Sequence, residues 1–119
     1  MMAPVFPQPD LAQPGFAHPV ERELARIFDE LEIPWLYEPT TFVLERHPDG
    51  SVAEAFTPDF YLPEQDMYVE CTTMRQKLTA RKNRKLRKLR EQGVLVTVLY
   101  RRDFQRLRER HGFPFEIAA

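Results

Sequence analysis

Two acidic residues in the stretch FTPDFYLPEQDMYVECTTM have the type and spacing of a divalent-cation site. Asp59 lies in one predicted strand, and Glu70 lies in the next strand, beyond a tight loop. Because side chains alternate along a strand, Glu70 shares a face with Thr72, whereas Cys71 faces the other way. Carboxylates from two neighbouring strands can bind one cation, and Mg²⁺ or Mn²⁺ suits such a site because it keeps water ligands for a phosphate or a nucleophile. The sequence therefore predicts a metal site shared by Asp59 and Glu70.

The elements that would position these carboxylates are predicted from hydrophobic periodicity and from turn residues. Apolar residues recur at helical spacing after Pro19, and Pro34 ends that helix. Asp49-Gly50 marks a hairpin turn, and Pro58 interrupts the strand that follows. The almost wholly apolar run VLVTVLY is typical of a strand covered on both faces. The predicted elements are a helix over 19–32, strands over 35–46, 51–62 and 67–73, a helix over 79–92 with Thr79 as N-cap and Gly93 at its end, a strand over 94–100, and a helix that begins at Asp103 and ends at His111-Gly112.

This order, αβββαβα, predicts an α/β fold with a mixed β-sheet flanked by helices. A chain of 119 residues suits a single domain. Five of the 11 prolines fall in the first 19 residues, where they prevent a helix and remove hydrogen-bond donors from any strand. Residues 1–17 are therefore predicted to form a disordered Pro-rich tail, and residues 18–119 the folded domain.

The composition also excludes several classes of protein. Cys71 is the only cysteine, which excludes an intramolecular disulfide and any Cys-rich zinc module. No apolar run reaches the ~20 residues of a membrane span. The start, MMAPVFPQP, has neither the basic nor the apolar region of a secretory signal. We therefore expect a cytoplasmic protein that does not contact a membrane.

Charge is divided unevenly along the chain. Residues 1–70 carry 3 Lys/Arg against 14 Asp/Glu, whereas residues 71–119 carry 14 against 4. From Arg75 to Arg90 nine of 16 residues are basic and none is acidic. Such a run lacks the paired signs that stabilise an exposed helix, so it favours a bound polyanion. The residues predicted to bind nucleic acid, with DNA as the expected partner, are Arg75, Lys77, Arg81, Arg84, Lys85, Arg87, Lys88, Arg101 and Arg102.

The central stretch also resembles the motif of the PD-(D/E)XK nuclease superfamily, whose fold is called restriction endonuclease-like. Pro58-Asp59 matches the PD element, and Glu70-Cys71-Thr72 occupies the place of (D/E)XK. The resemblance covers most of residues 18–104. The family's core order, αβββαβ, agrees with the order predicted above from the residues.

This resemblance implies a metal-dependent DNA endonuclease that hydrolyses phosphodiester bonds with Mg²⁺ or Mn²⁺. It implies that Asp59 and Glu70 are metal ligands and that the backbone carbonyl of Cys71 is a further ligand. The acid on the first helix of many members falls on Glu21. Glu21 lies at the rim of that helix's apolar face, so it is predicted to be a supporting ligand or acid.

One position departs from the family motif, because Thr72 stands where the family has a lysine that helps to position or activate water. The basic helix offers a replacement. On a helical wheel Lys82 falls within the apolar arc made by Leu78, Leu86 and Leu89, which faces the sheet. A lysine on that face needs an anionic partner, and the strand carboxylates can provide one. We therefore predict that Lys82 supplies the catalytic cation.

Two other functions stay open at this point. Loss of the motif lysine favours a catalytically inactive nucleic-acid-binding module that keeps the nuclease fold. A basic helix could also dock on an acidic protein partner. Because a domain of this size covers few base pairs, a homodimer is a further possibility.

Overall fold

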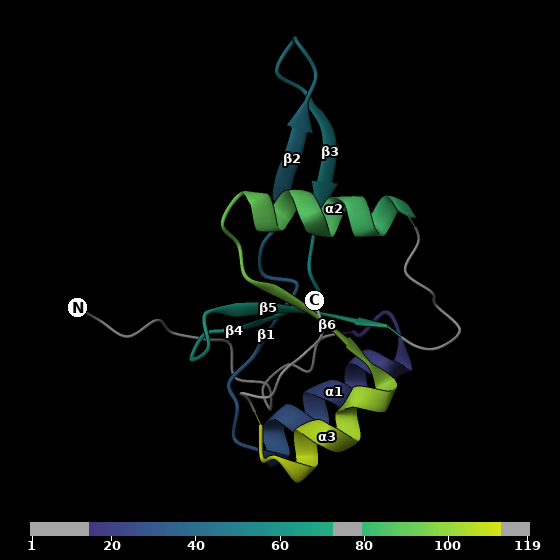
Figure 1. The fold of residues 1–119 in the computed structure, drawn as a ribbon, viewed down its shortest axis with the longest axis vertical. Helices are drawn as coiled ribbons and strands as arrows, with labels where there is room; N and C mark the ends of the chain where they lie inside the picture. The colour runs from purple at the N-terminus through teal and green to yellow at the C-terminus, as the bar shows by residue number, and fades with distance from the viewer. Residues whose placement is uncertain (1–14, 73–79, 113–119) are drawn as a thin grey trace, which may run out of the picture.

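The computed structural model describes residues 15–72 and 80–112. These residues form a small α/β domain with a mixed four-stranded sheet, a separate two-stranded hairpin and three α-helices (Figure 1). The helices are α1 (Pro19–Glu30), α2 (Ala80–Glu91) and α3 (Phe104–Glu109), and the 3-10 turn η1 (Arg101–Asp103) precedes α3. The strands are β1 (Leu36–Tyr37), β2 (Phe42–Arg46), β3 (Val52–Phe56), β4 (Phe60–Leu62), β5 (Met67–Thr72) and β6 (Val96–Tyr100).

The four-stranded sheet has the order β1-β4-β5-β6. β4 is antiparallel to both β1 and β5, whereas β6 is parallel to β5 after the crossover through α2. Helix α2 covers one face of this sheet, and α1 and α3 cover the other (Figure 1). Because β4 and β5 are antiparallel neighbours in the middle of the sheet, the start of β4 lies beside the end of β5. Asp59 and Glu70 were predicted to converge at this end of the two strands.

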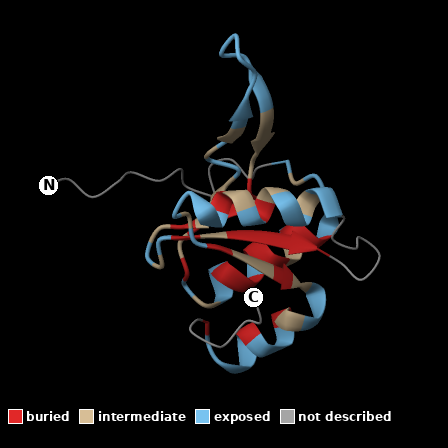
Figure 2. Ribbon diagram, turned by 45° about the horizontal axis from the view of Figure 1, so that its top comes forward, coloured by how far each residue is buried: buried red, intermediate tan, exposed pale blue. Residues whose placement is uncertain are grey.

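Two predicted strands are each divided in the structure, so the predicted element order is incomplete. The segment 35–46 contains β1 and β2, and the segment 51–62 contains β3 and β4. In both segments the break coincides with a proline, Pro39 and the buried Pro58, which has no N–H to donate to a neighbouring strand. The inner halves pair with each other as the hairpin β2–β3, which projects away from the four-stranded sheet (Figure 1). The outer end of this hairpin is exposed, whereas the buried residues gather on the sheet and on the helix faces that cover it (Figure 2).

The helix boundaries follow the sequence closely. α1 ends two residues earlier than predicted, and α2 ends just before Gly93, whose φ of +87° favours glycine. Thr79, the predicted N-cap of α2, lies outside the described residues. Asp103 does not cap α3 as predicted, because its Oδ2 accepts the backbone N–H of Tyr100 at 2.8 Å within the preceding 3-10 turn.

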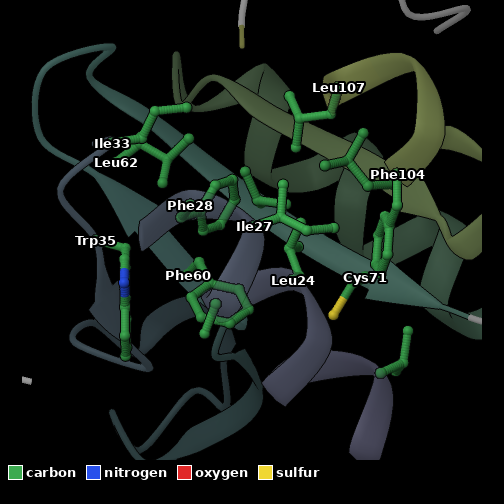
Figure 3. Close-up of a cluster of buried hydrophobic side chains, with 14 of the residues drawn as sticks. Leu24, Ile27, Phe28, Ile33, Trp35, Phe60, Leu62, Cys71, Phe104 and Leu107 are labelled. Atoms are coloured by element: carbon green, nitrogen blue, oxygen red, sulfur yellow. The ribbon is translucent and has the colours of Figure 1, made fainter. Parts of the chain in front are cut away.

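The main core lies between the sheet and the pair α1 and α3 (Figure 3). Phe60 is fully buried at its centre and stacks edge-on against Phe28 and Trp35. The predicted alternation along β5 is confirmed, because Val69 and Cys71 join this core whereas Tyr68 packs on the α2 side. β6 is covered on both faces, as its apolar sequence predicted.

The boundary of the domain lies earlier than residue 18. Phe16 contacts the rings of Trp35, Tyr37 and Phe60, and the backbone N–H of Ala17 donates to the carboxylate of Glu21. Phe16 and Ala17 therefore pack on the folded domain, whereas residues 1–14 of the predicted tail lie outside the described ranges. Within those ranges the structure contains no helix that is both long enough and apolar enough to cross a membrane.

Candidate active site

Asp59 and Glu70 contact each other at the end of the two central strands where β4 begins and β5 ends. Because Phe60 pairs with Val69, the preceding Asp59 lies beside Glu70. The backbone N–H of Asp59 donates to Oε1 of Glu70 at 3.1 Å, and the backbone N–H of Cys71 donates to Oδ2 of Asp59 at 2.9 Å. These reciprocal bonds fix both carboxylates relative to the backbone.

Glu21 reaches the same place from the first turn of α1. Its side chain is buried, and Oε1 accepts the hydroxyl of Tyr37 at 2.6 Å and the backbone N–H of Ala17 at 3.2 Å. One potential ligand atom from each of Glu21, Asp59 and Cys71 lies within 4.8 Å of the others. Glu21 therefore lies beside Asp59 and Cys71, and its role as a supporting ligand or acid stays a prediction.

Lys82 also reaches this cluster, as its place on the helical wheel predicted. Its Nζ lies 2.5 Å from Oε2 of Glu70, which is buried on the α2 side of β5. Lys85 is the neighbouring lysine on the same helix, and its Nζ donates instead to the backbone carbonyl of Ala55 at 3.1 Å. The tertiary structure therefore separates two lysines that differ little in the sequence.

These side chains line one cavity of about 370 Å³. Thr72, which replaces the motif lysine, is buried in its wall. The cavity is lined by Ala17, His18, Glu21, Glu38, Asp59, Glu70, Cys71, Thr72 and Lys82.

Two groups of the cavity, Asp59 and Cys71, have raised pKa values. Burial first, and then the negative charge of Glu70, raises the pKa of Asp59 well above its usual range. Burial also raises the pKa of the Cys71 thiol, and the nearby carboxylate of Asp59 raises it further. A cation placed among these groups would favour their ionised forms, since it would offset the repulsion between the carboxylates.

The carboxylate oxygens of Glu21, Asp59 and Glu70 differ in the number of partners that they already have. Both oxygens of Glu70 have partners, Asp59 N–H and Lys82. Among the described residues no donor contacts Oε2 of Glu21 or Oδ1 of Asp59, so these two atoms are the ones open to a ligand. The donor set of carboxylate oxygens suits a hard cation such as Mg²⁺ or Mn²⁺. The carbonyl of Cys71 as a further ligand stays a prediction.

Sequence reasoning missed Tyr37, which contacts Glu21 from the far side of the site. Tyr37 lies on β1, and no motif or spacing links it to a helix residue 16 positions earlier. Glu38, His18 and Ala17 were also not predicted to line the site. The only signal that could have found them is long-range pairing, which one sequence does not contain.

The expectation that the basic run lacks compensating acid is wrong for Arg84 and Lys88, which pair with acids of the hairpin. Glu54 on β3 pairs with Arg84 at 2.8 Å and with Lys88 at 3.0 Å. Lys88 also pairs with Glu45 on β2, and Lys85 bonds the hairpin backbone. Hydrogen bonds from Arg84 and Lys88 lower the pKa of Glu54 to about 2, so the pairing carboxylate is ionised at neutral pH. Acids of the hairpin therefore neutralise Arg84 and Lys88 on α2.

The other predicted phosphate contacts have different surroundings. Arg81 and Arg87 are exposed on α2, and no acid pairs with them in the described part of the chain. Arg101 pairs with Glu23 at 3.1 Å, and Arg102 lies over the ring of Tyr100 at 4.5 Å. Arg75 and Lys77 lie outside the described residues.

No protein-family model, curated protein or solved structure matches this chain, so its function must be argued from the site itself.

Proposed function

We propose that this protein is a metal-dependent endonuclease that hydrolyses phosphodiester bonds in DNA. The observation that carries the proposal is the convergence of the predicted acids and the predicted lysine on a single cavity. Glu21, Asp59, Glu70 and Lys82 come from four different elements or their ends. Carboxylates beside a lysine are the groups that metal-assisted phosphoryl transfer requires, namely cation ligands and a fixed positive charge.

The order of the elements supports the same proposal. If the hairpin β2–β3 is treated as an insertion, the remaining core reads α1, β1, β4, β5, α2, β6. This is the order αβββαβ that the resemblance to PD-(D/E)XK nucleases implies. Asp59, directly before β4, and Glu70, on β5, then correspond to the acidic motif residues of that family.

Glu21 and Asp59 would hold Mg²⁺ or Mn²⁺ through their open oxygens, with Glu70 joining when Lys82 releases it. Bound there, the cation would polarise the scissile phosphate and lower the pKa of a water molecule. Tyr37 and Cys71 keep the two carboxylates oriented through the hydrogen bonds to their other oxygens.

Lys82 replaces the charge that Thr72 cannot supply. Its ammonium lies against Glu70, which neutralises it and limits where it can move. In a substrate complex the same ammonium can donate an N–H to a phosphate oxygen and stabilise the negative charge that develops there. Glu70 is then the residue that positions Lys82.

A metal-dependent cleavage assay tests this proposal. The full chain should cut DNA when Mg²⁺ or Mn²⁺ is present and should stop when the cation is chelated. Duplex, branched and single-stranded DNA and an RNA of the same sequence should be compared, since the cavity itself does not distinguish these substrates. Absence of cleavage on all of them would contradict the proposal.

The second candidate function is a catalytically inactive nucleic-acid-binding module. The observation that favours it is the Lys82–Glu70 ion pair, which occupies an oxygen that a catalytic cation would need. Retention of Asp59 and Glu21 in hydrogen-bonded positions with open oxygens favours the enzyme.

We expect the double variant Arg81→Ala and Arg87→Ala to bind DNA more weakly at every sequence. These arginines are exposed on α2, and no acid among the described residues pairs with them, so the salt slope of binding should fall by about one for each phosphate that is no longer neutralised. Ala preserves the helix because it has the highest helix propensity. Binding titrations at several salt concentrations measure the effect.

Arg110→Ala is the matched control, because Arg110 is exposed just after α3 on the opposite side of the sheet. It should retain the affinity and slope of the wild type. Equal affinity of the double variant and the wild type would place the phosphate-binding surface elsewhere.

A further inference from the structure

The carboxylate of Glu21 is held through only one of its oxygens. Oε1 accepts both the Tyr37 hydroxyl and the Ala17 N–H, at 2.6 and 3.2 Å. Within the described residues no donor contacts Oε2. A carboxylate held in this way can offer one oxygen to a cation, but it must break two hydrogen bonds to offer both.

Tyr37 is itself fixed by the core. Its ring lies 5.6 Å from the ring of Phe60 and 4.8 Å from that of Phe16, both in edge-on geometry. The Tyr37 hydroxyl is the donor in the 2.6 Å hydrogen bond to Glu21, because a phenol is protonated at neutral pH. Moving the hydroxyl away from Glu21 would disturb the contact of this half-buried ring with the buried Phe60.

Cations differ in the carboxylate geometry that they accept. Mg²⁺ requires nearly octahedral coordination and usually takes one or two carboxylates, whereas Ca²⁺ accepts six to eight oxygens and often binds both oxygens of one carboxylate. Hydrogen bonds to a ligand's other atoms commonly decide between such modes.

We infer that Tyr37 is a positioning residue that restricts Glu21 to single-oxygen coordination and so makes the cavity select Mg²⁺ over Ca²⁺. This inference rests on the proposed function, because it assumes that the cavity binds a divalent cation. It adds a residue on β1, outside the acidic motif, that sets which cation the site accepts.

The test is a calorimetric titration of the full chain with Mg²⁺ and, separately, with Ca²⁺. Tyr37→Phe removes only the phenolic oxygen and retains the ring. We expect it to weaken Mg²⁺ binding by about 10- to 100-fold, as loss of a hydrogen bond to a metal ligand commonly does. Ca²⁺ binding should weaken less or become tighter, because only the longer bond from the Ala17 N–H, at 3.2 Å, then holds Oε1 of Glu21 away from the cation. The ratio of the Ca²⁺ to the Mg²⁺ affinity should rise.

Tyr61→Phe is the matched control. Tyr61 also donates its hydroxyl to a carboxylate, that of Asp66 at 2.7 Å, but this pair does not line the cavity. If Tyr37→Phe fails to fold, Ala17→Pro removes the other donor to Oε1 from an exposed position and should raise the same ratio.

The outcomes separate this inference from the proposed function. A wild type that binds neither cation overturns both. A wild type that binds Mg²⁺, together with a Tyr37→Phe variant whose Ca²⁺ to Mg²⁺ ratio equals that of Tyr61→Phe, overturns the role of Tyr37 alone. A raised ratio in Tyr37→Phe with an unchanged ratio in Tyr61→Phe supports it.

Discussion

Asp59→Asn should abolish the rise in melting temperature that Mg²⁺ or Mn²⁺ gives the wild type, and DNA cleavage should be lost with it. Asp59 has one oxygen held by Cys71 N–H and the other open to the cavity. The amide keeps an acceptor for Cys71 but is a much weaker cation ligand. A cation that binds only the folded state stabilises it, so loss of cation binding removes the rise in melting temperature.

Without added cation, Asp59→Asn should melt at or above the temperature of the wild type at neutral pH. Burial first, and then the charges of Glu70 and Glu21, raise the pKa of Asp59 to about 8, so this carboxyl is largely uncharged at neutral pH and the amide replaces one neutral group by another. Asp66→Asn is the matched control, because Asp66 lies in the loop between β4 and β5, outside the cavity. An Asp59→Asn variant that keeps the full thermal shift would exclude Asp59 as a ligand.

Lys82→Ala should lower DNA cleavage by about 100-fold or more while cation and DNA binding are retained. Removal of one group that stabilises transition-state charge commonly costs about two to three powers of ten in rate. Because such a group acts in the transition state, the loss should appear in kcat and not in the affinity for substrate. Release of Glu70 from its ion pair should leave cation binding intact or make it tighter.

Lys85→Ala is the control for charge, because Lys85 lies on the same helix and contacts the backbone of Ala55 outside the cavity. It should cleave almost as fast as the wild type. Thr72→Lys in the Lys82→Ala background should restore part of the rate, since Thr72 lines the cavity at the motif position. If the wild type cleaves nothing and Thr72→Lys alone creates cleavage, the protein is an inactive relative and Lys82 has no catalytic role.

A melting curve of Lys82→Ala with Mn²⁺ present shows whether the variant is folded. This check is needed because the change leaves the buried Glu70 without its cation, and a buried charge that loses its partner is strongly destabilising. A folded variant with the cleavage rate of the wild type would contradict the prediction.

Local features of the sequence determined the elements around the site. Helix α1, the end of α2 before Gly93 and the alternation along β5 all depend on residues within a few positions of one another. The identity of the candidate site followed in the same way, because Asp59 and Glu70 lie on adjacent strands joined by a short loop. Lys82 was predicted because a lysine on the apolar face of a helix requires an anionic partner.

Only the tertiary structure decided which distant segments pair. Nothing within the segment 35–46 shows that its first residues join β4 while its last residues join β3, since both halves are equally suited to a strand. Because each segment is divided between the sheet and the hairpin, Tyr37 lies beside Glu21. For the same reason Glu54 lies against α2, where it neutralises Arg84 and Lys88. Backbone propensity and side-chain periodicity act over a few residues, whereas the partner of a strand, a buried carboxylate or a charged helix depends on how the whole chain packs.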